Sequence, residues 1–192
     1  HLPNFAPDLA GAAPADRAAL GVPADALFVL TMGRLHPNKG FDVLIEALAH
    51  LPDVVVAVAG EGEQRAALTA LAQQRGVDGR VRFLGWRDDQ ARLLAACDLF
   101  VCPSRHEPLG NVVLEAWSAA RPVVAASSPG PAELIAHGTT GLLVPVEDAR
   151  ALADAIAALR DHPARARALA EAGRVTFRRE HAEAPVLARW CG

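Results

Sequence analysis

The chain has 192 residues, of which 52% are apolar and 21% are charged, and its formal net charge is −3. This composition is typical of a globular domain and excludes disorder, and the small negative charge provides no bulk attraction to nucleic acid or to an anionic membrane. Because no run of about 18 apolar residues occurs, we expect no membrane-spanning helix.

Residues 1–24 carry prolines and glycines among many alanines, which is typical of a linker, and we expect one short helix there at Asp16–Leu20. Six short apolar runs follow, and each predicts a buried strand. The runs are Ala26–Met32, Val54–Ala59, Val81–Leu84, Asp98–Cys102, Pro122–Ala126 and Gly141–Val144.

Segments with helical spacing of apolar residues separate these strands. The expected helices are Phe41–Leu48, Glu63–Arg75, Asp88–Ala96, Asn111–Ala119 and Ala132–His137. The acidic pair Asp88–Asp89 is expected to cap its helix. The remainder, Asp148–Gly192, is predicted to be helical with breaks at Pro163, Gly173 and Pro185.

This alternation of uninterrupted apolar strands and helices predicts an α/β fold with a doubly wound, six-stranded parallel sheet. Helices should cover both faces, and a helical tail should end the chain. In such sheets the ligand binds beside the loops that follow the carboxyl ends of the strands. Unusual polar and glycine residues collect in those loops, which indicates a binding site there.

The loop Gly33–Gly40, after the first predicted strand, contains Arg34 and Lys39. The chain uses Arg eighteen times and Lys once, so we interpret Lys39 as a required point charge. Two cations beside free backbone N–H groups suit a diphosphate, although an ordinary solvated loop would fit the same residues. The P-loop pattern is absent, and the Gly60–Gly62 turn gives little reason to expect NAD.

The stretch Ser104–Trp117 joins the fourth predicted strand to its helix. Glu107 lies in the turn, Asn111 begins the helix, and Glu115 follows within the helix. Free N–H groups and a carboxylate at a helix start can hold a polar, anionic ligand. A glutamate near a helix start also has a purely structural use, because it complements the helix dipole.

The sequence predicts neither a metal site nor a disulfide. None of the seven histidines falls in a metal-binding pattern. The three cysteines, Cys97, Cys102 and Cys191, are odd in number and lack CxxC spacing, so we expect buried thiols in a reducing compartment.

Taken together, five motifs resemble the C-terminal, donor-binding half of GT-B glycosyltransferases, in particular the large retaining family 4. The family pattern G-R-L-x-x-x-K-G matches Gly33–Gly40, and its P-S-x-x-E-x-x-G-x-x-x-x-E pattern matches Pro103–Glu115. Its shorter GxG, x-F-x-G and G-x-L-V patterns match Gly60–Gly62, Arg82–Gly85 and Gly141–Val144. The matches occur in order over nearly the whole chain, and residues 25–182 would form the Rossmann-like domain.

The resemblance implies a role for each matching position. Gly33, Arg34 and Lys39 would hold the diphosphate of a UDP- or GDP-linked sugar. Arg34 and Lys39 would stabilise the negative charge on the diphosphate as it leaves the sugar. Glu107 would bind the donor sugar and Glu115 the ribose hydroxyls. The backbone N–H groups at the helix start would bind sugar and phosphate; these belong to Leu109, Gly110 and Asn111. The base pocket, next to the third strand, would be lined by Gly85 and Trp86. Such enzymes usually need no metal.

Three departures from the family pattern concern the sugar pocket. Pro108–Leu109 replaces a common Gly-Phe pair, Ala120 stands where a helix-ending glycine is usual, and Pro129 replaces the first glycine of a pair. Pro108 removes one backbone donor. The Glu107–Asn111 variant is similar to that of bacterial enzymes that build lipopolysaccharide core or envelope glycans.

The resemblance also implies a missing half. Leu2–Asn4 resembles the linker that leaves an N-terminal acceptor-binding domain, and 183–192 resembles the helix that crosses back onto it. We therefore expect an isolated domain with little or no transferase activity. The apolar residues of that helix, Val186, Leu187 and Trp190, are expected to pack elsewhere in the domain, to mediate self-association or to be mobile. We also expect a cytoplasmic enzyme, with any peripheral contact with the inner face of the membrane made only through the missing half. Two alternatives stay open: a GT-B sugar-nucleotide epimerase, and a non-catalytic α/β binding module.

Overall fold

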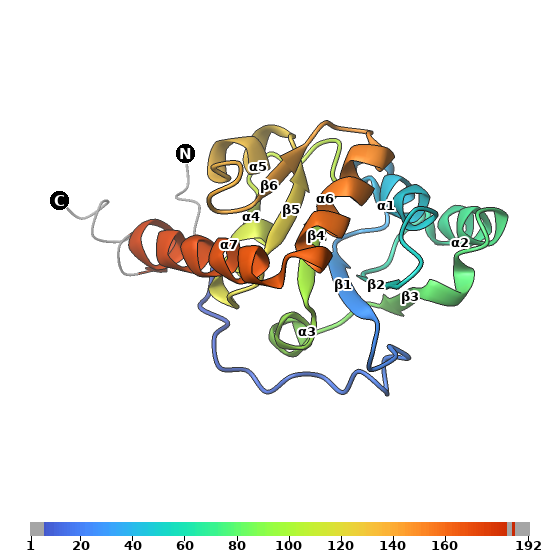
Figure 1. Ribbon diagram of the computed structural model, residues 1–192, viewed down its shortest axis with the longest axis horizontal. Coiled ribbons are helices and arrows are strands. Elements are labelled where there is room, and N and C mark those ends of the chain that lie inside the picture. The colour runs from blue at the N-terminus through green and yellow to red at the C-terminus, as the bar shows by residue number, and fades with distance from the viewer. Residues whose placement is uncertain (1–5, 184–185, 187–192) are drawn as a thin grey trace.

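The computed structural model describes residues 6–183 and residue 186, and these form one parallel sheet with helices on both faces (Figure 1). The six-stranded sheet has the order β3-β2-β1-β4-β5-β6. Its strands are β1 (Leu27–Met32), β2 (Val54–Ala59), β3 (Val81–Gly85), β4 (Leu99–Cys102), β5 (Val123–Ala126) and β6 (Leu142–Val144). The predicted α/β sheet is confirmed, and each strand begins and ends within one residue of its expected bounds.

The apolar runs form parallel strands because both faces of the sheet are buried. In β2, Val54, Val56 and Val58 face one core, while the alternate residues Val55 and Ala57 face the other. A strand with such neighbours needs apolar side chains at every position. The strand pairs β1–β2 and β1–β4 place β1 in the middle of the sheet.

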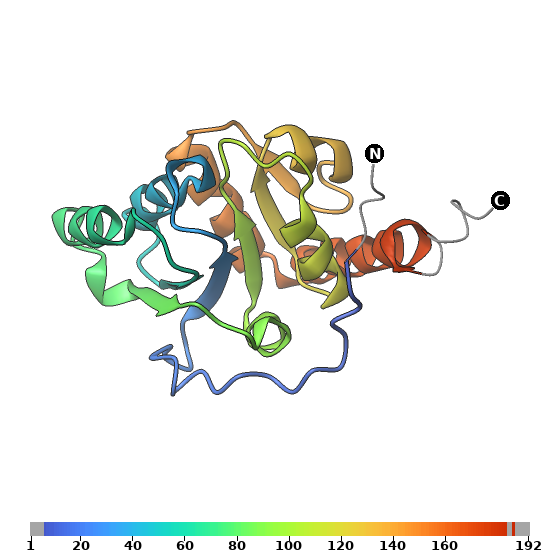
Figure 2. The same cartoon turned by 180° about the vertical axis from the view of Figure 1, so that it is seen from behind.

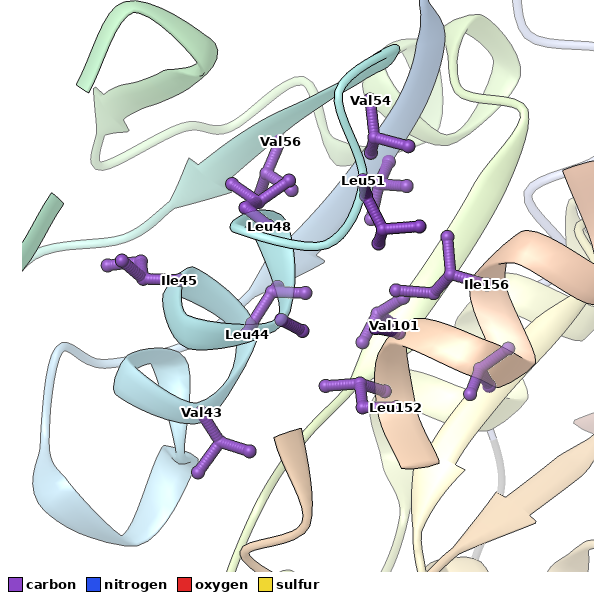
Figure 3. Close-up of a cluster of buried hydrophobic side chains, with 14 of the residues drawn as sticks. Val43, Leu44, Ile45, Leu48, Leu51, Val54, Val56, Val101, Leu152 and Ile156 are labelled. Atoms are coloured by element: carbon purple, nitrogen blue, oxygen red, sulfur yellow. The ribbon is translucent and has the colours of Figure 1, made fainter. Parts of the chain in front are cut away.

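One face of the sheet is covered by three helices, α1 (Phe41–Leu48), α2 (Arg65–Gln74) and α6 (Ala149–Asp161) (Figure 1). Figure 3 shows Leu44 and Leu48 of α1 directed toward the same buried layer as Ile156 of α6. The apolar stripe of α1 recurs at helical spacing, which is why this short helix can bury one side against the strands.

The opposite face is covered by α3 (Gln90–Ala96), α4 (Asn111–Ser118) and residues 6–24, which run along this side in Figure 2. The Ala15 N–H donates to the Arg92 carbonyl at 2.9 Å, and the Leu9 N–H donates to Ser118 Oγ at 3.2 Å. These contacts hold residues 6–24 against the domain. The short helix expected at Asp16–Leu20 is wrong, because these residues form turns.

Helix α7 (Pro163–Thr176) continues through Gly173, so the break expected there is wrong. Gly173 is buried, and the Trp117 ring of α4 packs directly on its Cα, where a Cβ would overlap the indole. Glycine is therefore present for close packing rather than to end the helix. A π-helix, Phe177–His181, extends α7. The predicted break at Pro185 and most of the predicted crossing helix lie outside the described residues.

Two other expectations differ from the structure for local reasons. Helix α5 (Pro129–Leu134) begins three residues before the expected Ala132, because proline is tolerated in the first turn of a helix. Asp89 precedes α3 but makes no side-chain cap; its carboxylate accepts two hydrogen bonds from the Arg87 guanidinium, each at 2.7 Å. None of the helices among the described residues is long and apolar enough to cross a membrane.

The strand order places β1 beside β4, with β2 and β3 on one side and β5 and β6 on the other. The direction of winding reverses between β1 and β4, and the loops that follow these two strands flank the point of reversal. Open α/β sheets bind their ligands in the crevice at this position. The fold therefore brings the loop that holds Arg34 and Lys39 next to the loop that holds Glu107.

We predict that Gly173→Ala lowers the free energy of unfolding by about 1–3 kcal/mol, because the added methyl must displace the buried Trp117 ring. Chemical denaturation measures the loss. Gly79→Ala is the matched control, since a Cβ at Gly79 has no neighbour within 4 Å. Equal stability of the two variants would contradict the packing role of Gly173.

Candidate functional site

The loops after β1 and β4 pack backbone to backbone at the carboxyl edge of the sheet. Gly40 has a left-handed backbone with φ 65°, and a Cβ there would overlap the carbonyl oxygen of Pro103. The His106 N–H donates to the Asn38 carbonyl at 3.2 Å. Only glycine allows this close approach, which fixes the end of the Gly33–Gly40 loop against the β4 loop.

A buried ion pair connects the two loops. Lys39 Nζ lies 2.6 Å from Glu107 Oε2, and the two side chains are only 25% and 10% exposed. The backbone carbonyl of Glu107 also accepts a hydrogen bond of 2.7 Å from the Gly130 N–H, which connects the first turn of α5 to this loop. Lys39 and Glu107, which belong to two separate sequence motifs, thus contact each other directly.

A cleft of about 450 Å³ opens between the loops that follow β1, β2 and β3 and the first turns of α4. Four predicted binding residues line it, namely Gly33, Arg34, Trp86 and Glu115. The remaining lining residues are Met32, Ala59, Gly60, Glu61, Arg87, Gln90 and Val112. Its polar groups and its exposed tryptophan can accept a flat, hydroxyl-bearing molecule such as a nucleoside.

Glu115 is half-buried on the wall of this cleft. Burial raises the pKa of its carboxyl above the ordinary value of 4.5, and the nearby Glu107 charge raises it further. No cation among the described residues pairs with this carboxylate, which can accept hydrogen bonds from hydroxyl groups of a bound molecule.

Arg34 extends into solvent at the mouth of the cleft, with 73% of its side chain exposed. Within the described part of the chain its guanidinium pairs with Glu63, with Nη2 3.4 Å from Glu63 Oε2. The backbone N–H of Glu63 and then the charges of Arg34 and His36 lower the pKa of the Glu63 carboxyl. An exposed, weakly tethered guanidinium can turn toward an anion without losing a buried contact.

The other predicted residues surround the cleft without lining it. Leu109, Gly110 and Asn111 lead into α4, with Gly110 in the left-handed region at φ 69° and Asn111 exposed. The Gly85 carbonyl accepts a hydrogen bond of 2.8 Å from the Gly60 N–H, which places Trp86, 70% exposed, at the rim. The structure therefore gathers every predicted site residue at one edge of the sheet, in two adjoining groups.

Sequence reasoning missed several residues that build the site. Gly60 packs against the Gly33 backbone, and Glu61 lines the cleft. Gly130 also lies against the backbone of Gly110 and Glu107, where a Cβ would not fit. The glycine positions were the available signal, but which backbone each one approaches follows only from the fold.

The structure shows no further reactive centre among the described residues. Cys97 and Cys102 are buried and unpaired, and burial raises the pKa of the Cys97 thiol to about 12. Both behave as small apolar groups, as expected, while Cys191 lies outside the described residues. Nowhere in residues 6–183 do three or more His, Cys, Asp or Glu side chains gather in a manner that could hold a metal ion.

Comparison with known proteins identifies the family. The model of the family "Glycosyl transferases group 1" matches residues 13–176. The chain belongs to this family. Its fold, with a six-stranded parallel sheet and a helical C-terminal region, is the Rossmann-like fold of the GT-B neighbours.

Three similar proteins illustrate the family. The lipopolysaccharide core biosynthesis glycosyltransferase LpsE of Rhizobium meliloti is 50% identical over 163 residues, which cover 84% of this chain and 48% of LpsE. The D-inositol 3-phosphate glycosyltransferase of Mycobacterium avium is 38% identical over 187 residues, which cover 92% of this chain and 44% of that protein. The structure of Anabaena Alr3699/HepE in complex with UDP and glucose superposes with a TM-score of 0.87 at 31% identity, covering 91% of this chain and 49% of that one. The chain spans about half the length of the curated relatives it matches.

The raised pKa of Glu115 predicts how stability depends on pH. Because the folded state favours the protonated carboxyl, the full stability is present below the ordinary pKa of 4.5 and is lost as pH rises through the folded value. Glu115→Gln removes this loss, so the variant should gain in melting temperature relative to the natural chain between pH 4 and pH 7. A difference in melting temperature between the two proteins that is constant from pH 4 to pH 7 would contradict the raised pKa of Glu115.

We also predict that Lys39→Met destabilises the domain by about 1–3 kcal/mol, because the nearly buried Glu107 carboxylate loses its cation. Adding Glu107→Gln to Lys39→Met should restore part of this stability, as urea unfolding would measure. Arg150→Met is a control, since the Arg150–Asp154 pair is exposed and contributes little. Simple additivity of the two site substitutions would show that the pair is not energetically coupled.

Proposed function

We propose that this chain is the donor-binding domain of a retaining, family 4 glycosyltransferase that takes its sugar from a UDP- or GDP-linked donor without a metal. The observation that carries the proposal is the cleft beside the point where the winding of the sheet reverses. Glu115 lies on its wall, and the Lys39–Glu107 pair joins the neighbouring loops after β1 and β4. Family membership and the similarity to the UDP-bound Anabaena protein support this proposal, and they favour UDP over GDP.

The proposed arrangement assigns one part of the donor to each part of the site. The nucleoside would lie in the cleft, with its ribose hydroxyls donating to Glu115 and its base beside Trp86. The diphosphate would lie between Arg34 and Lys39, beside the backbone N–H groups of Gly110 and Asn111. Glu107 would accept hydrogen bonds from the sugar hydroxyls, with Lys39 Nζ shared between the Glu107 carboxylate and the diphosphate.

The reaction would break the bond between the anomeric carbon of the sugar and the oxygen of the diphosphate. The acceptor hydroxyl oxygen would form the new bond to this carbon on the same face, and its proton would pass to the departing diphosphate. Negative charge grows on the diphosphate as the bond breaks, so the cations of Arg34 and Lys39 would stabilise the transition state more than the bound donor.

The acceptor is proposed to be a lipopolysaccharide or envelope glycan, by similarity to the Rhizobium protein. Residues that bind it would belong to the remainder of a protein about twice this length, so the isolated domain would bind the donor without transferring it. Product analysis of the full-length protein, with and without acceptor, separates a transferase from an epimerase, because only the epimerase changes the nucleotide sugar without an acceptor.

Titration calorimetry of this chain with UDP, GDP and ADP tests nucleotide binding. We expect a measurable affinity for UDP, and Lys39→Met should weaken it about tenfold to a hundredfold, because a charge-assisted hydrogen bond contributes about 1.5–3 kcal/mol. Absence of heat with all three nucleotides at millimolar concentration would reject the proposal.

Binding of inorganic diphosphate, compared with binding of UDP, distinguishes the diphosphate-binding residues from the nucleoside-binding residues. Glu115→Ala should weaken UDP binding about tenfold through the lost ribose contacts and leave inorganic diphosphate binding unchanged. Lys39→Met should weaken both. If Glu115→Ala weakened diphosphate binding as much as UDP binding, the assignment of Glu115 to the nucleoside would be wrong.

A further inference from the structure

Arg105 connects three loops at the carboxyl edge of the sheet. It follows β4, and its guanidinium reaches the loop after β1 on one side and the loop after β6 on the other. Its Nη1 donates to the Pro37 carbonyl at 2.8 Å and to Asp42 Oδ1 at 2.8 Å, and its Nη2 donates to Asp42 Oδ2 at 2.6 Å. Its Nε donates to Glu147 Oε1 at 2.7 Å.

These contacts use four of the five N–H donors of the guanidinium. The side chain is 26% exposed, and the hydrogen bonds to Asp42 form a two-pronged fork that only arginine can provide. Burial opposes ionisation of Asp42, but its hydrogen bonds with Arg105 keep the pKa of that carboxyl below its ordinary value. Arg105 is therefore committed to protein contacts and has little capacity left for a ligand.

The segment that Arg105 holds contains the lysine of the site. Pro37 and Lys39 are the first and last residues of a single 3₁₀ turn, whose N-terminal carbonyl is the acceptor for Arg105. The neighbouring residue His106 fixes the same turn through its bond to the Asn38 carbonyl. Glu107, the partner of Lys39, follows His106 directly in the chain. The fork thus fixes both members of the ion pair relative to each other.

The third contact of Arg105 is with Glu147, whose backbone conformation is unfavourable. Glu147 has φ 63°, a left-handed conformation that a non-glycine residue adopts at a cost. Its carboxylate reaches Arg105 across the edge of the sheet, between β6 and α6. The bond to Arg105 connects the loop before α6 to the site.

We propose that Arg105 is a positioning residue that sets the geometry of the Lys39–Glu107 pair for the donor diphosphate. The expected effect of Arg105 on UDP affinity rests on the proposed function. Its effect on the position of Lys39 relative to Glu107 does not depend on any ligand. A merely structural arginine would contribute to stability alone.

The single lysine of the chain makes the test direct. Lysine labelled with ¹³C and ¹⁵N gives one side-chain signal, which reports Lys39 without assignment. We expect Arg105→Gln to move the ligand-free Lys39 signal toward its position in Glu107→Gln, where the partner charge is absent. Arg75→Gln, which removes the exposed bond to Glu46 on the outer helices, is the control and should leave the Lys39 signal in place.

Binding of UDP provides the second readout. Arg105→Gln should weaken UDP affinity about tenfold, as expected for coupled neighbours, and it should have no further effect in the Lys39→Met background. If Arg105→Gln does not fold, Asp42→Asn tests the same fork and should move the Lys39 signal in the same direction.

The outcomes are distinct. A variant that loses melting temperature but keeps the natural Lys39 signal and UDP affinity overturns the positioning role. If UDP does not bind the natural chain, the proposed function fails, and the ligand-free Lys39 signal still decides whether Arg105 positions the pair.

Discussion

The site depends on one constraint, the contact between a cation and a carboxylate. The two groups belong to the loops that follow the two central strands, β1 and β4. Lys39 and Glu107 are 68 residues apart in sequence, yet their charges lie 2.6 Å apart where the winding of the sheet reverses. Water is largely excluded from both side chains, so neither charge is stable without the other or a ligand that replaces it. A ligand with an anionic diphosphate and a hydroxyl-rich sugar offers a partner to each.

The surrounding structure supports this contact from several directions. Gly40 allows the loop after β1 to lie against Pro103, and Gly130 brings the first turn of α5 onto the Glu107 carbonyl. The parallel sheet fixes where these loops begin, because its strands are buried on both faces and cannot shift register without exposing apolar side chains. Rigid strands and close backbone packing thus prepare the geometry before a ligand arrives, which reduces the entropy lost on binding.

Sequence reasoning predicted the sheet, which the structure confirms, because continuous apolar runs are a local signal. It also pointed to the loops that the structure gathers at one edge of the sheet, and their role as a binding site stays a prediction. It failed where the cause lies elsewhere in the chain. Gly173 resembles a helix break until the Trp117 ring is placed on it, and Asp89 resembles a cap until Arg87 takes its carboxylate. The pairing of Lys39 with Glu107 likewise follows from the strand order, which no single motif contains.

The chain belongs to the glycosyl transferases group 1 family and spans about half the length of the curated relatives it matches, and we propose that it binds the sugar donor. The most direct measurement is a crystal structure of the chain with UDP. The account predicts the uridine in the cleft, with ribose hydroxyls on Glu115 and the diphosphate within hydrogen-bond distance of Lys39 Nζ. UDP bound away from this cleft, or a diphosphate that contacts neither Arg34 nor Lys39, would contradict it.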